Sequence, residues 1–135
     1  MSKSWIVATG ILGMLGVMIG AYGAHGLEGM LQGSGNDLDW VNKRLDQCET
    51  AVRYHLLHTV ALLALSLSPL GGYWWSKWTA SFWLIGILLF CGGLYSIVFF
   101  DMLGHWAIVP LGGMSLMVGW LGLIVLGLTG SRQAS

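Results

Sequence analysis

Four long apolar runs constrain the fold of this chain more than any other feature of its sequence. The first covers about residues 5–24 and contains no charged residue. Its length is close to the roughly 20 residues that a helix needs to cross a hydrocarbon core about 30 Å thick. The other runs cover about residues 52–68, 78–100 and 111–128. Because hydrocarbon offers the backbone no hydrogen-bond partner, each run is expected to form a helix.

The expected fold class is therefore all-α: an integral membrane four-helix bundle in which residues 1–135 form a single domain. Composition agrees, because 56% of the residues are hydrophobic and only 9% are charged. A soluble domain carries about 25% charged residues, so this surface is not one that faces water on all sides. The formal net charge is zero, and no basic patch indicates binding of nucleic acid.

The first run also has features of a secretory signal, with Lys3 before an apolar stretch and small residues after it. The stretch from Trp5 to Tyr22 is longer than the about 7–15 apolar residues of a signal peptide. It is therefore predicted to be a retained first span. Cys48 and Cys91 have no metal-binding spacing and are expected at different depths, which predicts two free thiols.

An amphipathic segment of about residues 37–51 precedes the second span. Its apolar residues recur at steps of three and four, with polar residues on the other faces. Asn36 or Asp37 is a plausible N-cap. This pattern predicts an interfacial helix between the first and second spans, which either bends or continues into the second.

Small residues recur at steps of three and four in the first and fourth spans, and this spacing lets two helices approach closely. The alternative reading is a groove that holds the tail of a lipid or a quinone. The residues predicted to pack against other helices are Gly13, Gly16, Gly20, Gly112, Ser115 and Gly119.

Four spans place both termini on one side of the membrane, and alternation then places all four histidines on the opposite side. Ionisable groups near hydrocarbon are costly and often functional. We expect the polar groups around the start of the second span to lie at the edge of the hydrocarbon. The candidate ligand-binding residues are His25, Arg53, Tyr54, His55, His58 and Asp101.

Three interpretations of these residues remain open. In the first they cap helices and form ion pairs, with Arg53 bound to Glu49 or Asp101. In the second they bind a quinone or a lipid headgroup, with arginine supplying charge. In the third, two neutral imidazoles, with or without a carboxylate, bind a metal or haem. His105 follows the third span and falls on the same side. The sequence names no cofactor.

No nucleophile–base pattern, phosphate loop or carboxylate pair is evident, so an enzymatic role is not predicted. The leading hypothesis is a non-catalytic accessory or scaffold subunit, in a membrane complex or a homo-oligomer. The expected partners are membrane lipids and either other membrane-protein subunits or a second copy of the chain. The alternative is a membrane protein that binds a quinone, lipid, metal or haem. A transporter ranks third, because the spans hold no charged residue deep in the core.

Four stretches of the sequence resemble the domain of unknown function 423 family, which includes transmembrane protein 256-like proteins. They are residues 20–27, 49–58, 89–95 and 110–113, and they cover all four spans in order. The resemblance implies a small four-helix protein of bacterial inner membranes, with no established activity. Val109 departs from the threonine common in that family. Positive residues near the span ends are tied between the two sides, so the rule that they favour the cytoplasm does not decide orientation. Acidic residues in the loop before the second span favour cytoplasmic termini.

Overall fold

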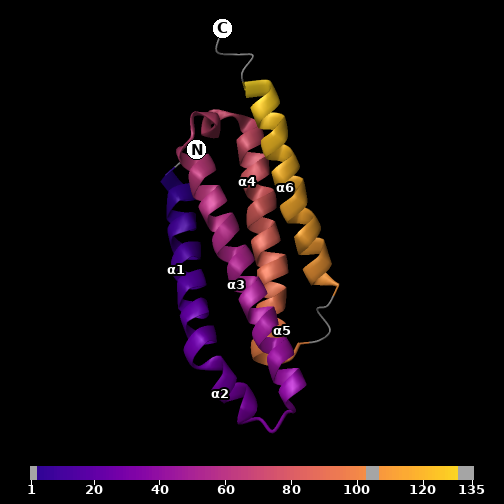
Figure 1. Ribbon diagram of the computed structural model, residues 1–135. Coiled ribbons are helices and arrows are strands. Elements are labelled where there is room, and N and C mark those ends of the chain that lie inside the picture. The colour runs from indigo at the N-terminus through magenta and orange to yellow at the C-terminus, as the bar shows by residue number, and fades with distance from the viewer. Residues whose placement is uncertain (1–2, 103–106, 131–135) are drawn as a thin grey trace.

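A computed structural model describes residues 3–102 and 107–130 of the 135-residue chain, and its long helices run side by side (Figure 1). Within the described part there are helices and turns but no strand. Four helical stretches are long and apolar enough to cross a membrane: Lys3–His25, Leu38–Leu67, Trp74–Phe100 and Ile108–Thr129. The expected all-α membrane bundle is confirmed.

The first half of the chain is an antiparallel helical pair, α1 (Lys3–His25) and α3 (Leu38–Leu67), joined through the short helix α2 (Leu27–Gln32). The side chain of Asp37 accepts a hydrogen bond of 2.8 Å from the backbone N–H of Trp40, so Asp37 is the N-cap of α3. The predicted amphipathic segment continues without a break into the second span, and together they make one 30-residue helix. At 1.5 Å per residue this helix is about 45 Å long. Its charged first half therefore extends beyond the hydrocarbon.

The third span is not a uniform α-helix. It consists of α4 (Trp74–Gly86), a π-helical turn η2 (Ile87–Cys91) and α5 (Gly92–Phe100). A short 3₁₀ turn, η1 (Pro69–Gly72), leads into α4 from the end of α3. The last span is α6 (Ile108–Gly130), which packs along α4 and η2.

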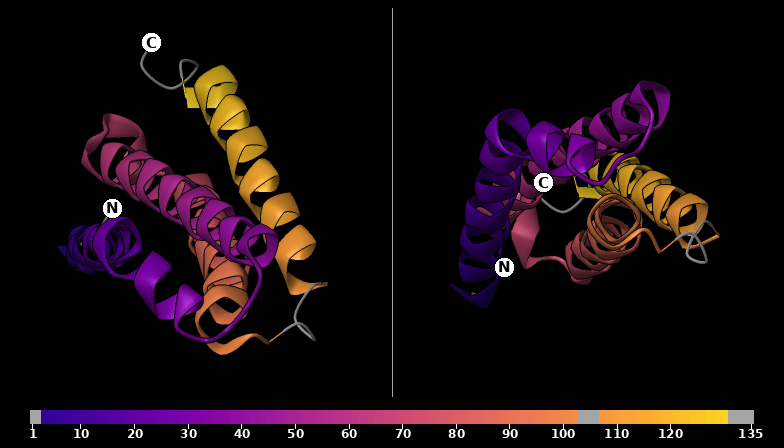
Figure 2. Two further views of the ribbon diagram at one scale, coloured as in Figure 1. Left: turned by 60° about the horizontal axis from the view of Figure 1, so that its bottom comes forward. Right: turned by 90° about the horizontal axis from the view of Figure 1, so that it is seen from below.

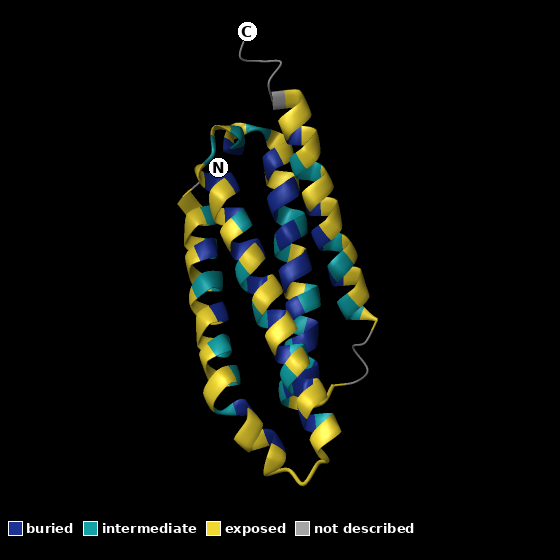
Figure 3. Ribbon diagram, in the orientation of Figure 1, coloured by how far each residue is buried: buried dark blue, intermediate teal, exposed yellow. Residues whose placement is uncertain are grey.

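Figure 2 shows α1 and α6 at opposite sides of the bundle, with α3 and the third span between them. In Figure 3 both α1 and α6 are largely exposed, and the buried residues are most frequent in the helices between them. Among the long helices, α1 packs chiefly on α3. The main core cluster lies between α3, α4, η2 and α6, and Trp83 is its largest fully buried side chain. A second cluster, with Leu27 and Cys48 among its members, lies where α2 meets α3 and α5. Cys48 and Cys91 are both buried and free, which confirms the prediction of two free thiols.

Glycines mark the closest helix–helix approaches within the chain. A Cβ atom added to Gly16 would lie 2.6 Å from Leu56 Cδ2, and one added to Gly119 would lie 2.4 Å from Trp83 Cδ1. The tightest contact is at Gly112, where a Cβ would lie 2.2 Å from the backbone nitrogen of Phe90 in η2. The remaining predicted packing residues also face a neighbouring helix: Gly13 faces Thr59, Gly20 faces Val52, and Ser115 Oγ donates a 2.7 Å hydrogen bond to Phe82 O.

The two ends of the bundle differ in composition. The start of α1, the η1 turn and the last turns of α6 lie at one end (Figure 1). Exposed tryptophans gather there at the start of α4, as expected at a membrane–water interface. The other end carries α2, the start of α3 and the end of α5. The exposed tryptophans are Trp74, Trp75 and Trp78.

Candidate functional site

His58 is a hydrogen-bonded bridge between α3 and α6. Its Nδ1 lies 2.7 Å from the backbone oxygen of Tyr54, and its Nε2 lies 3.1 Å from Nε1 of Trp120. An indole N–H only donates and a carbonyl oxygen only accepts. His58 must therefore be a neutral imidazole with its proton on Nδ1. Both ring nitrogens are occupied, so binding a metal or haem through His58 would require one of these hydrogen bonds to break.

His55 connects three helices. Its Nδ1 lies 3.2 Å from the hydroxyl oxygen of Tyr95 on α5. On the other side its ring faces α1, where a Cβ added to Gly16 would lie 3.6 Å from His55 Cγ. His55 is buried, and its Nε2 has no hydrogen-bond partner among the described residues. The imidazole also interacts with the backbone of Leu12 on α1, so His55 has polar contacts on both sides.

The expectation that His55 and His58 lie at the edge of the hydrocarbon was wrong. His55 faces Gly16 in the middle of α1, and His58 contacts Trp83 in the third span and Trp120 in the middle of α6. The physical reason is the register of the antiparallel pair. Because α3 begins many residues before its apolar half, Cys48, and not His55, lies opposite Gly23 near the end of α1.

The six predicted ligand-binding residues do not form one cluster. Arg53 pairs with Glu49 at 2.5 Å, and both are largely exposed. Of the two alternative partners predicted for Arg53, Glu49 is the one observed, and this pair contributes little to stability, below about 1 kcal/mol. Tyr54 is 41% exposed, and its ring lies 5.0 Å from that of Phe90. His25 is exposed at the end of α1. His105 lies outside the described residues.

Asp101 binds Arg44, a residue that the sequence analysis did not single out. Arg44 is 4% exposed although it lies in the polar half of α3, and its Nη2 is 2.5 Å from Asp101 Oδ1. Nη1 donates to Gln47 Oε1 at 3.0 Å, and the guanidinium lies 4.8 Å from the centre of the Trp40 ring. Asp101 ends α5 with φ 50°. This ion pair fastens the start of α3 to the end of the third span. In the sequence, the i,i+4 spacing of Trp40 and Arg44 indicates a contact between these two side chains but does not indicate the ion pair with Asp101.

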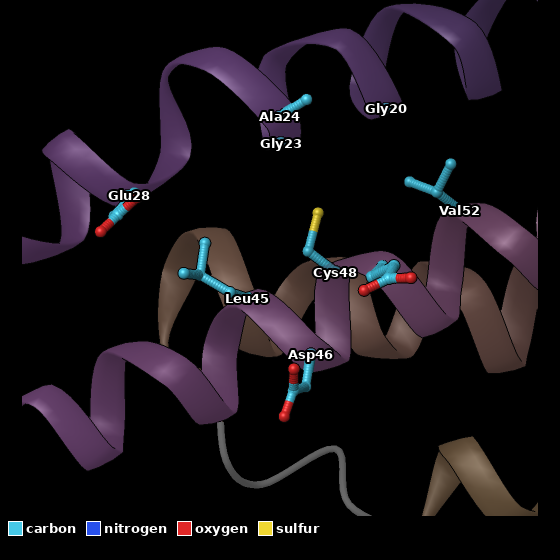
Figure 4. Close-up of a pocket in the computed structure, with 9 residues that line it drawn as sticks. Gly20, Gly23, Ala24, Glu28, Leu45, Asp46, Cys48 and Val52 are labelled. Carbon is cyan, nitrogen blue, oxygen red and sulfur yellow. The ribbon is translucent and has the colours of Figure 1, made fainter.

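A groove opens between α3 and the α1–α2 segment at the end of the bundle away from the termini (Figure 4). Its volume is about 380 Å³. Small and apolar residues form its walls, and three acidic residues join them. The sequence analysis missed this groove, because its two sides are brought together only by the register of α1 against α3. Its lining residues are Gly20, Gly23, Ala24, Glu28, Leu45, Asp46, Cys48, Glu49 and Val52.

The described residues contain no group of three or more His, Cys, Asp or Glu side chains placed to hold a metal ion. His55 and His58 lie one turn apart, but their ring nitrogens bind different helices. Three hydrogen bonds inside the bundle join different helices: His55 to Tyr95, Trp120 to His58, and Ser115 to Phe82.

Residues 19–113 match the family model whose description is protein of unknown function, DUF423. The chain belongs to the DUF423 family. The resemblance seen in its sequence motifs is thereby confirmed, and the DUF423 match covers parts of all four spans.

Curated relatives of this DUF423 chain are named UPF0382 membrane proteins. One from Haemophilus influenzae is 34% identical over 123 residues, which cover 91% of this chain and 92% of the relative. YwdK of Bacillus subtilis is 37% identical, with 91% and 94% covered. YgdD of Escherichia coli, named an inner membrane protein, is 30% identical, with 92% and 88% covered. No solved structure gave a significant match. The chain is a membrane protein whose family name assigns no activity.

Proposed function

We propose that this chain is a non-catalytic accessory membrane protein that acts by lateral association with another membrane helix through α1. The observation that carries the proposal is how little of α1 its own bundle covers. Only 17% of the most apolar window of α1 is buried, compared with 39% in α3 and 44% in the third span. An apolar helix covered on one side only is free to pack against a second helix in the bilayer.

One face of α1 fits such a contact. Val7, Met14 and Val17 are each about 60% exposed. Gly10 lies between them, and a Cβ added to it would meet nothing within 4 Å. With Ala21, these residues follow steps of three and four, the spacing of a helix–helix seam. The glycines predicted to drive association, by contrast, already pack inside the chain. The proposed contact therefore depends on this α1 face (Val7, Gly10, Met14, Val17 and Ala21).

Cysteine cross-linking in native membranes tests the proposal. The experiment uses Met14→Cys in a chain whose Cys48 and Cys91 are replaced by alanine. Oxidation by a membrane-permeant copper complex is expected to give an adduct, either of twice the 14.6 kDa monomer mass or with a second membrane protein that mass spectrometry identifies. Both adducts support association through α1, because a disulfide requires Cα atoms within about 7 Å of each other.

Leu121→Cys is the matched control for this experiment. Leu121 lies at a similar exposure, 60%, on the outer side of α6. Random collisions in the membrane would cross-link both positions at similar rates. Equal yields at Met14 and Leu121, or no adduct at either, would contradict the proposal.

We further propose that the protein lies in a bacterial inner membrane with both termini in the cytoplasm. The inner-membrane relative in Escherichia coli and the acidic residues near the start of α3 support this placement. Green fluorescent protein fused after Ser135 is expected to be fluorescent, and alkaline phosphatase fused there is expected to be inactive. The reverse pattern would mean that the termini lie on the outer side.

The alternative function is binding of a quinone, lipid, metal or haem through the six polar residues named above, and it has less support. His25 and Arg53 are exposed at the bundle surface, whereas His55 and His58 are buried in its interior. A ligand touching all six would have to extend from the membrane surface to the middle of the bundle.

A further inference from the structure

A second groove lies between α3 and α6, in the half of the bundle that holds the termini. Helix α6 packs on α4 and η2, and its backbone hardly approaches α3. Figures 1 and 2 show α3 and α6 diverging toward the end that carries the η1 turn, with α4 between them. The space left there has a volume of about 300 Å³. Two spans therefore border a space that neither of them fills.

This α3–α6 groove has walls from three spans and opens sideways. Ala61 and Ala64 of α3 line one wall, and Leu123 of α6 lines another. Trp83 of α4, which is 1% exposed, also lines the groove. Ala64 is exposed, so the groove is not closed on its outer side. Because hydrocarbon surrounds these spans, the groove opens to lipid.

The groove extends from the membrane–water interface to about the middle of the bilayer. At its inner end Trp120, which lines it, donates a 3.1 Å hydrogen bond to Nε2 of His58, and this bond joins α6 to α3. At its other end Ser68 lines it just before the η1 turn. Trp83 lies about 14 Å further along α4 than Trp74 of the exposed tryptophans, at 1.5 Å per residue. This distance is about half of the roughly 30 Å hydrocarbon thickness, which is the depth of one leaflet.

The polar side chains that line the groove are engaged or face the protein. The hydroxyl of Ser68 donates a 2.9 Å hydrogen bond to a backbone oxygen of α3, and the indole N–H of Trp120 makes the bond that closes the inner end. Trp83 Nε1 has no hydrogen-bond partner among the described residues, but a Cβ added to Gly119 would lie 2.6 Å from it. Gly119 does not line the groove. The groove therefore favours a guest without polar groups.

We propose that the α3–α6 groove holds one acyl chain of a phospholipid whose headgroup lies at the membrane surface on the side of the termini. A volume of about 300 Å³ is that of about ten water molecules in the liquid, at roughly 30 Å³ each, and a methylene group is of similar size. The groove thus accommodates about ten methylene groups of one chain. Without a chain, Trp83 and the alanines of α3 would border a void and lose dispersion contacts.

Other guests fit this groove less well. A transmembrane helix is about 10–12 Å across and is too wide for it. The ring of a quinone carries carbonyl acceptors, which would find no free donor directed at them. The acyl-chain proposal concerns other helix surfaces than the association through α1 and does not depend on it.

Photochemical labelling shows which residues touch the lipid chain. The full-length protein is reconstituted into phosphatidylcholine vesicles in which some of the lipid carries a diazirine in the middle of one acyl chain. After illumination, mass spectrometry is expected to find the label on Leu65, which lines the groove although it is 3% exposed. Leu62, 0% exposed and one turn away on α3, does not line the groove and is expected to stay unlabelled. Label on exposed Leu121 but not on Leu65 would overturn the proposal.

Two variants of α3 separate the groove from the lipid that surrounds the bundle. Ala61→Phe fills the groove and is expected to abolish labelling of Leu65. Leu67→Phe also enlarges a side chain of α3, but Leu67 is 66% exposed and does not line the groove, so labelling of Leu65 is expected to persist. Circular dichroism verifies that both variants keep their helical content. Loss of the label from Leu65 in both variants, or in neither, would contradict the proposal.

Native mass spectrometry of the protein released from vesicles provides a readout that needs no photochemistry. One phospholipid is expected to remain bound to the wild type and to Leu67→Phe, and to be lost from Ala61→Phe. Phosphatidylglycerol with the same chains is expected to be retained as well as phosphatidylcholine, because the groove contacts only the chain. Equal retention by all three proteins would overturn the proposal. Displacement of the phospholipid by ubiquinone would also overturn it and would assign the groove to a quinone.

Discussion

Replacing Gly112 by alanine is expected to destabilise the bundle by about 3 kcal/mol, the upper part of the usual range for overpacking. The added Cβ would lie 2.2 Å from the backbone nitrogen and 2.7 Å from Cα of Phe90. Neither atom can rotate away as the end of a side chain can. The clash is relieved only if α6 moves away from the π-helical turn η2, which also loosens the contacts of α6 with α4. The measurement is the free energy of unfolding in mixed micelles.

Gly127→Ala is the matched control, because Gly127 lies on the same helix and a Cβ there would meet nothing within 4 Å. Both substitutions bring the same gain in helix propensity. Gly127→Ala is therefore expected to raise the free energy of unfolding, by at most about 1 kcal/mol, and not to lower it. If the two variants were equally stable, α6 would not approach η2 as closely as described.

Replacing His58 by alanine is expected to destabilise the bundle by a similar amount, about 3 kcal/mol, as large-to-small substitutions in a core do. His58 is 2% exposed, and its ring packs against those of Trp83 and Trp120. The substitution leaves a cavity between them. It also leaves the indole N–H of Trp120 without its partner, which water does not replace inside a bilayer.

His25→Ala serves as the control for this prediction, because it removes the same side chain from an exposed position at the end of α1. Thermal unfolding in detergent is expected to leave His25→Ala close to the wild type and to lower the midpoint only for His58→Ala. Equal effects of the two substitutions would mean that His58 does not bridge α3 and α6.

The approximate positions of the spans could be predicted from the sequence, because the thickness and the apolar nature of the hydrocarbon set the length and composition of each span. A helix that crosses hydrocarbon must satisfy its backbone internally and stay apolar for about 20 residues. Runs of that length are visible without any knowledge of tertiary contacts. The helix contacts at small residues could also be predicted, because steps of three and four place these residues on one face of a helix. Gly16 against Leu56 and Gly119 against Trp83 are examples.

The polar contacts were harder to predict because they depend on depth along neighbouring helices. The Glu49–Arg53 pair follows from spacing on one helix, and the sequence was sufficient for it. The Arg44–Asp101 pair joins residues far apart in the chain, and the position of Arg44 in a polar segment gave no sign of its burial. His55 and His58 were placed at the membrane edge because the polar residues before them were taken to mark that edge.

The sequence by itself determined that the chain lies in a membrane and that it has four spans, because both depend on the length and polarity of local stretches. Only the tertiary structure decided the register of α1 against α3. That register follows from how Gly16 and Gly23 fit against Leu56 and Cys48, and such a fit is a property of two surfaces together. It is also what buries His55 in the interior and opens the groove beside Cys48.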